Sequence, residues 1–145
     1  MGFLVTENER TLAMDAVRDV APAELRLLDD LCTKPSILDR LRRTSVGYGI
    51  EPALELFAPY AIVLAVWIKS VVHDEVRKDA EVRLRRLVRR LLGRKAEMVG
   101  APETADTADL RRVTTEYAHQ LGLSRERATL LADALVGHLD RGNRG

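Results

Sequence analysis

The stretch that decides the fold is LFAPYAIVLAVWI, residues 56–68, which carries no charged side chain over thirteen consecutive positions. Residues 69–95 follow directly and contain ten basic against four acidic side chains. A segment that is apolar on all faces predicts either a helix surrounded by other helices or a helix that enters a membrane. The change from apolar to cationic sequence therefore bears on both the fold and the surfaces through which the chain acts.

Some features of the apolar segment favour a membrane and others favour a protein core. Tyr60 and Trp67 lie near opposite ends, as interfacial anchors do, and the sequence beyond Val72 is strongly basic. A span, however, needs about 20 apolar residues to cross roughly 30 Å of hydrocarbon. The thirteen uncharged residues of this segment rise only about 20 Å as a helix. Acidic residues are also mixed into the basic flank. The sequence thus leaves open whether residues 53–72 span a membrane or form a buried core helix, with the core as the first expectation. Pro59 predicts a kink, unless the helix begins there.

The composition predicts an all-α protein. Apolar residues make up 46% of the 145 residues but aromatic residues only 4%, which suits packed helices better than a sheet. Apolar residues recur at intervals of three and four, and no segment alternates at period two. We predict a bundle of about six helices around the central apolar helix. Its parts are a helical domain in 1–95, a linker in 96–109 and a C-terminal helix pair in 110–145, with a tail from Arg141 onward.

An arginine-rich amphipathic helix is expected over residues 74–92. One interpretation of its arginines is a solvated face with local ion pairs, because Asp79 lies four residues before Arg83. The same spacing joins Glu81 to Arg85. Four further arginines lack an acidic residue at that spacing, which indicates that this face meets something negative: Arg86, Arg89, Arg90 and Arg94.

Residues 117–131 resemble a helix-turn-helix. The turn contains a glycine, and Ser124 is placed to cap the second helix. In DNA-binding versions the start of the second helix enters the major groove, so Arg125 and Arg127 would reach base edges or phosphates. The same pattern fits an ordinary corner between two helices. Nucleic-acid binding through Ser124, Arg125 and Arg127 is therefore an alternative function.

The sequence offers no arrangement of catalytic or metal-ligating residues. His73, Asp74 and Glu75 are adjacent, so they point in different directions on a helix. Cys32 stands alone, which argues against a disulfide framework and a cysteine-based zinc site. We therefore expect no enzymatic activity, no metal and no cofactor. The first residues lack the basic start and long apolar run of a signal peptide, so a cytoplasmic location is expected, with membrane association if the apolar helix acts outward.

The order of these segments is similar to that of small uncharacterised helical proteins of high-GC bacteria. Such proteins pair a Pro-containing apolar helix with an Arg-rich one and end in a Leu-Gly-Leu…Leu-Ala-Asp-Ala helix. The matching stretches here are residues 58–92 and 121–136, about a third of the chain. The resemblance implies a helical bacterial protein, and it lends no established activity or site residues.

Together these patterns predict a non-enzymatic helical module that associates with an anionic membrane surface or docks to a protein partner, as an accessory or effector subunit. The alternatives are a DNA-binding regulator and a soluble structural bundle that forms homo-oligomers through an exposed apolar stripe. The premise of the main prediction is that the apolar and arginine helices act outward as one unit. The residues expected to bind the membrane or the partner are Phe57, Tyr60, Trp67, Arg83, Arg86, Arg89, Arg90 and Arg94.

Overall fold

The computed structural model describes the backbone of residues 5–33, 56–73, 77–92 and 106–144, and the side chains of 5–33, 56–71, 82–92 and 106–139. Over these ranges six α-helices pack together, joined by one short 3₁₀ segment and one π-helical segment, and no strand is present. The predicted all-α bundle is confirmed. A short helix is also expected from Ser36, because Ile37, Leu38 and Leu41 follow it at helical spacing, but these residues lie outside the described ranges.

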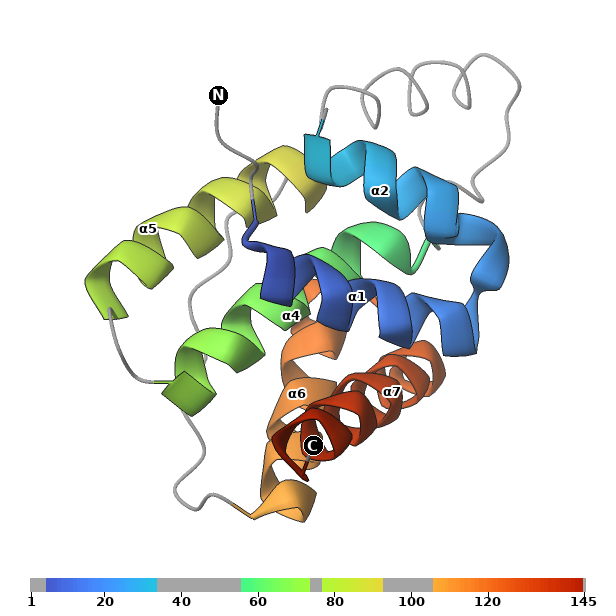
Figure 1. The fold of residues 1–145 in the computed structure, drawn as a ribbon, viewed down its shortest axis with the longest axis vertical. Helices are drawn as coiled ribbons and strands as arrows, with labels where there is room; N and C mark the ends of the chain where they lie inside the picture. The colour runs from blue at the N-terminus through green and yellow to red at the C-terminus, as the bar shows by residue number, and fades with distance from the viewer. Residues whose placement is uncertain (1–4, 34–55, 74–76, 93–105, 145) are drawn as a thin grey trace.

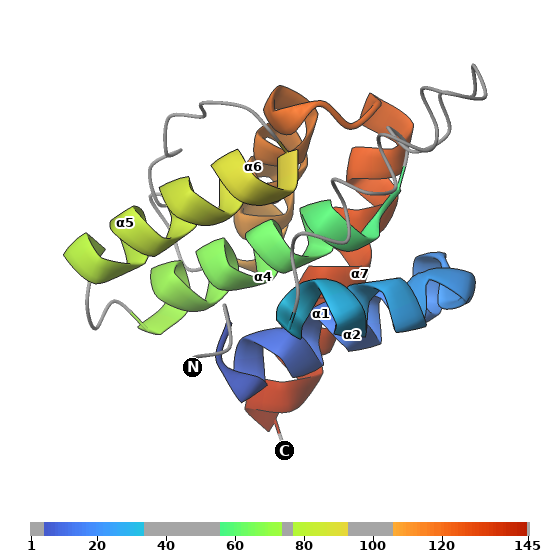
Figure 2. The ribbon, with the colours of Figure 1, turned by 90° about the horizontal axis from the view of Figure 1, so that it is seen from above.

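The apolar segment forms the central helix of the bundle, α4 (Ala58–His73). Figure 2 shows α4 between α5 on one side and α1 with α2 on the other, and α6 and α7 also contact it. Every residue from Phe57 to Ile68 is buried, and Trp67 and Ile68 are 0% exposed. Among the described residues, no helix combines the length and the apolarity needed to cross a membrane. Of the two alternatives left open by the sequence, this segment is therefore the buried core helix. Helix α4 does not form one outward-facing unit with the arginine helix.

The start of α4 explains how a helix accommodates Pro59. The helix begins at Ala58, so the proline lies in the first turn, where its missing N–H leaves no helical hydrogen bond unmade. The first N–H groups of a helix need acceptors from elsewhere. The carboxylate of Glu24, on another element, accepts a hydrogen bond from the Ala58 N–H at 2.8 Å. The sequence allowed either a kink at Pro59 or a helix that begins there, and the structure has the helix start.

The N-terminal helices cover one side of α4. Helix α1 (Glu7–Val20) begins with a capping box, in which the side chains of Thr6 and Glu9 bond each other's backbone N–H groups. A 3₁₀ turn, η1 (Pro22–Glu24), leads into α2 (Leu25–Thr33), and both helices pack on α4. An ion pair between Arg10 and Asp29 joins α1 to α2. Figure 1 shows α1 and α2 side by side, consistent with their contacts.

The arginine-rich segment packs on α4 through its apolar side. It comprises α5 (Arg77–Leu87) and a π-helical segment, η3 (Val88–Leu92). The buried residues of the described part recur at intervals of three and four, as an amphipathic helix predicts: Leu84, Leu87, Val88 and Leu91. Leu92 beyond them is buried as well. The expected start of this helix at Asp74 lies outside the described residues, as does Gly93, a residue type typical of a helix C-cap.

Helices α6 (Thr107–Leu121) and α7 (Arg125–Arg144) form the C-terminal pair. Gly122 has φ 127°, a conformation that L side chains rarely adopt, and the N–H of Leu123 bonds the Ala118 carbonyl at 3.2 Å. The predicted tail from Arg141 is wrong, because α7 continues to Arg144.

The C-terminal pair shares its core with the N-terminal helices. Helix α7 packs on α1, where His138 contacts Asp19 at 2.7 Å, and α6 packs on α4. Buried residues of both parts belong to one hydrophobic cluster. The predicted linker, 96–109, lies largely outside the described residues, so the division into 1–95 and 110–145 stays a prediction.

Candidate partner-binding surface

The three aromatic residues predicted to contact a membrane or partner lie in the core. Phe57 and Tyr60 are 7% and 8% exposed, and Trp67 is fully enclosed. The Trp67 ring meets the edge of Tyr117 on α6, with ring centres 5.3 Å apart and planes at 61°. Aromatic pairs in such geometry stabilise a core beyond the area they bury. In this fold the helices would have to separate before these rings reached a partner.

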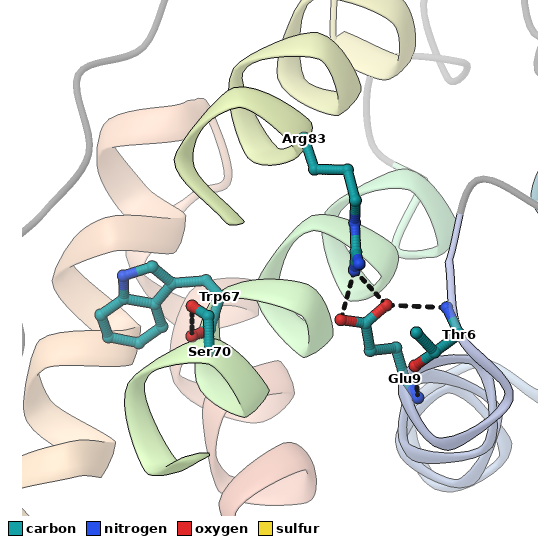
Figure 3. Close-up of polar contacts among 5 residues, drawn as sticks. All are labelled: Thr6, Glu9, Trp67, Ser70 and Arg83. Atoms are coloured by element: carbon teal, nitrogen blue, oxygen red, sulfur yellow. Dashed lines mark hydrogen bonds and ion pairs between the residues drawn. The ribbon is translucent and has the colours of Figure 1, made fainter. Parts of the chain in front are cut away.

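Arg83 differs from the other predicted arginines because it belongs to the fold. Its guanidinium donates to both carboxylate oxygens of Glu9 on α1, 74 residues away along the chain. The Glu9 side chain is only 9% exposed, and its Oε1 also accepts the Thr6 N–H at 2.8 Å. Figure 3 shows Arg83 reaching across from α5 to this carboxylate. The pair joins α5 to the start of α1 and therefore removes Arg83 from the candidate binding surface.

Four arginines remain on the outer side of α5 and η3: Arg85, Arg86, Arg89 and Arg90, which we call the arginine face. All four are exposed, and none has an ion pair among the described residues. They form two rows at the i,i+4 spacing, so each arginine has a like charge one turn away. Arg94, the remaining predicted member, lies outside the described residues.

Exposed arginines elsewhere provide a comparison. Several of them are paired with an acidic side chain: Arg18 with Asp15, Arg111 with Asp133, Arg112 with Asp109 and Arg125 with Glu116. Arg26 on α2 is exposed and has no ion pair among the described residues, but it is not part of a comparable cluster on one helix. The arginine face thus combines clustering on one segment with the lack of any ion pair among the side chains that the structure describes.

Two members of this surface were not predicted from the sequence. Arg85 was assigned to a local pair with Glu81, whose side chain lies outside the described residues. Val82 is 58% exposed, one helical turn before Arg85 and Arg86. A signal for Val82 existed in the sequence, because it falls outside the apolar stripe that packs on α4. Its spacing from Arg85 and Arg86 places Val82 on the same side of α5 as these two arginines.

The residues proposed for nucleic-acid binding are engaged within the chain. Ser124 caps α7 by accepting the Arg127 N–H at 3.3 Å. The Arg125 guanidinium donates to Glu116 at 2.9 Å, and that of Arg127 lies 5.1 Å from the centre of the Phe57 ring. These contacts describe a corner between two packed helices. All three residues are thus accounted for by contacts within the chain.

The buried reactive groups are held in their uncharged forms. Burial raises the pKa of the Cys32 thiol to about 11, a shift that nearby Arg10 opposes and Asp29 reinforces. Burial alone raises the pKa of Tyr117 to about 12. A thiol with a raised pKa is a poor nucleophile, since the thiolate is the reactive form. Within the described ranges, no group of three or more His, Cys, Asp or Glu side chains is placed to hold a metal ion.

The comparisons with known proteins identify no relative: no family model, no curated protein and no solved structure matches this chain. The similarity to small helical proteins of high-GC bacteria stays a prediction.

Proposed function

We propose that this protein is a non-enzymatic helical module that docks to an acidic partner protein through the arginine face. The observation that carries the proposal is the clustering on α5 and η3 of exposed arginines that form no ion pair within the part of the chain that the structure describes. Like charges one helical turn apart destabilise a helix by about 0.2–0.5 kcal/mol per pair. A negatively charged partner would reverse that cost, because it neutralises both rows at once. Arg89 and Arg90 belong to the π-helical segment, which further supports the proposal, since such segments are frequent at functional sites.

A protein partner is favoured over a membrane surface because the apolar residues of α5 and η3 are already packed inside the protein. An amphipathic helix binds a bilayer by burying its apolar face among the lipids, and charge alone anchors weakly. Here the apolar side of α5 and η3 packs on α4, and the aromatic residues near the start of α4 are buried. Val82 is the large apolar side chain exposed on the described part of this segment. Little apolar surface is therefore offered to a lipid.

A protein partner is also favoured over nucleic acid by the overall charge. Domains that bind nucleic acid through phosphate contacts usually carry a large positive surplus. The net charge of this chain is +1, so acidic groups elsewhere would repel a long polyanion. A small acidic patch on a protein would meet the arginine face without approaching those groups. The electrostatic term would mainly accelerate association and select the partner.

The experiment compares the binding of charge-reversal variants to defined probes. The R86E/R89E variant and the R26E/R112E control carry the same charge change, and circular dichroism first establishes that both are folded. Poly-glutamate, duplex DNA and phosphatidylserine vesicles are titrated at equal charge concentration. We expect poly-glutamate to bind best and R86E/R89E to weaken it about tenfold, with a small effect from the control. Equal weakening by both variants, or preferential binding of vesicles or DNA, would overturn the proposal.

A further inference from the structure

We infer that the element of the partner that contacts the arginine face is an acidic α-helix with an apolar residue opposite Val82. This inference rests on the proposed docking function and specifies the partner's structure. It depends on three observations: the two rows of arginines, the exposed Val82 beside them, and the Glu9–Arg83 ion pair that fixes how α5 is turned.

The two rows decide between a helix and an extended segment. Arg85 with Arg89 forms one row, and Arg86 with Arg90 forms the other, each running from α5 into the π-helical segment. A partner helix with acidic residues at i, i+1, i+4 and i+5 presents two staggered rows with the same repeat. An extended strand presents a single row of side chains on each face. A helix therefore brings carboxylates to both arginine rows, whereas a strand reaches only one.

Val82 supplies an apolar contact at one end of the charged rows. It is 58% exposed, and a β-branched residue at an exposed helical position is unfavourable compared with Ala, Lys or Glu. Its position, three and four residues before Arg85 and Arg86, places it on the same side of α5. An apolar side chain on the partner, one turn from its acidic rows, would cover Val82 and fix the register of the two helices.

The Glu9–Arg83 ion pair positions this surface. Arg83 lies between Val82 and Arg85 in sequence and is held toward α1 by both oxygens of Glu9. Since α5 also packs on α4 through Leu84 and Leu87, its rotation is fixed at two points. Val82 and the arginine face are consequently held outward before the partner arrives. A docking surface of this size and charge fits a fast, salt-sensitive, transient interaction.

The test uses two synthetic peptides of identical composition, each stabilised as a helix. In the patterned peptide, a Leu occupies position i and Glu residues occupy positions i+3, i+4, i+7 and i+8. In the scrambled peptide, the same residues are distributed around the helix. Fluorescence anisotropy with labelled peptides measures binding to the full chain at low and at physiological ionic strength. We expect the patterned peptide to bind about tenfold more tightly.

Variants separate the contribution of the arginine rows to peptide binding from that of Val82. R85E/R89E should abolish binding of the patterned peptide, and V82S should weaken it several-fold. R26E/R112E, which makes an equal charge change on other helices, should leave it nearly unchanged. Equal binding of both peptides, with loss in R85E/R89E, would overturn the helical partner and leave the proposed docking function intact. Failure of both peptides and of poly-glutamate to bind would overturn the inference and the proposed function together.

Discussion

Replacing Arg83 with methionine should destabilise the fold far more than the same change at Arg86. Methionine keeps the apolar stem of Arg83 but removes the guanidinium that donates to both oxygens of Glu9. Hydrogen bonds to charged groups contribute about 1.5–3 kcal/mol. Breaking a fully buried pair costs about 3–5 kcal/mol. Because the Arg83 side chain is 39% exposed, water can partly replace the hydrogen bonds that Glu9 loses. We therefore expect the free energy of unfolding to fall by about 2–3 kcal/mol.

The assay is urea denaturation followed by far-UV circular dichroism, which gives the free energy of unfolding for each variant. The double-mutant cycle of E9Q, R83M and E9Q/R83M isolates the pair, and we expect a coupling of about 1–2 kcal/mol. High salt should reduce this coupling only slightly, because Glu9 is shielded from solvent. R86M is the matched control and should change the stability by no more than about 0.5 kcal/mol. Equal effects of R83M and R86M, or a coupling near zero, would refute the assignment of Arg83 to the fold.

Part-buried Glu24 and the buried side chains of Tyr117 and Cys32 each give a testable expectation. E24A removes the carboxylate that accepts the Ala58 N–H, so it should destabilise the fold by about 1 kcal/mol in the same urea assay, whereas E7A at an exposed position should change little. Burial raises the pKa of Tyr117 from about 10 to about 12, so its contribution to stability is complete below pH 10 and declines as the pH rises toward 12. Y117F should reduce this decline, and an identical pH profile for Y117F and the original chain would contradict the burial of that ring. Cys32 should react with a disulfide reagent only when urea unfolds the chain, because burial raises its pKa to about 11; rapid reaction of the folded protein would disprove its enclosure.

The sequence was sufficient for the fold class and for the segment at its centre. Intervals of three and four between apolar residues predicted the helices, and the uncharged stretch predicted a helix apolar on all faces. The same stretch could not reveal what surrounds it. A helix such as Ala58–His73 has the same pattern of side chains whether its neighbours are lipids or other helices. Only the positions of α1, α2, α5, α6 and α7 distinguish these cases.

The candidate surface was predicted only in part, for a related reason. Local spacing paired Arg83 with Asp79, but the guanidinium bonds Glu9, a residue too distant in sequence for any helical pattern to indicate. Conversely, Arg86, Arg89 and Arg90 were singled out because no acidic residue lies four positions away, and they are exposed without ion pairs among the described residues. Sequence spacing thus shows whether an arginine has an acidic residue one turn away on its own helix. An acidic partner on another helix, such as Glu9, is found only from the three-dimensional structure.

The central claim is that the apolar helix forms the core, so that binding falls to the arginine face. The most direct measurement is acrylamide quenching of Trp67, the single tryptophan of the chain, with and without phosphatidylserine vesicles. Because this ring is 0% exposed, we predict blue-shifted emission and weak quenching that vesicles do not change, with strong quenching only in urea. Strong quenching in the folded protein, or quenching by a lipid-borne quencher when vesicles are added, would contradict the claim.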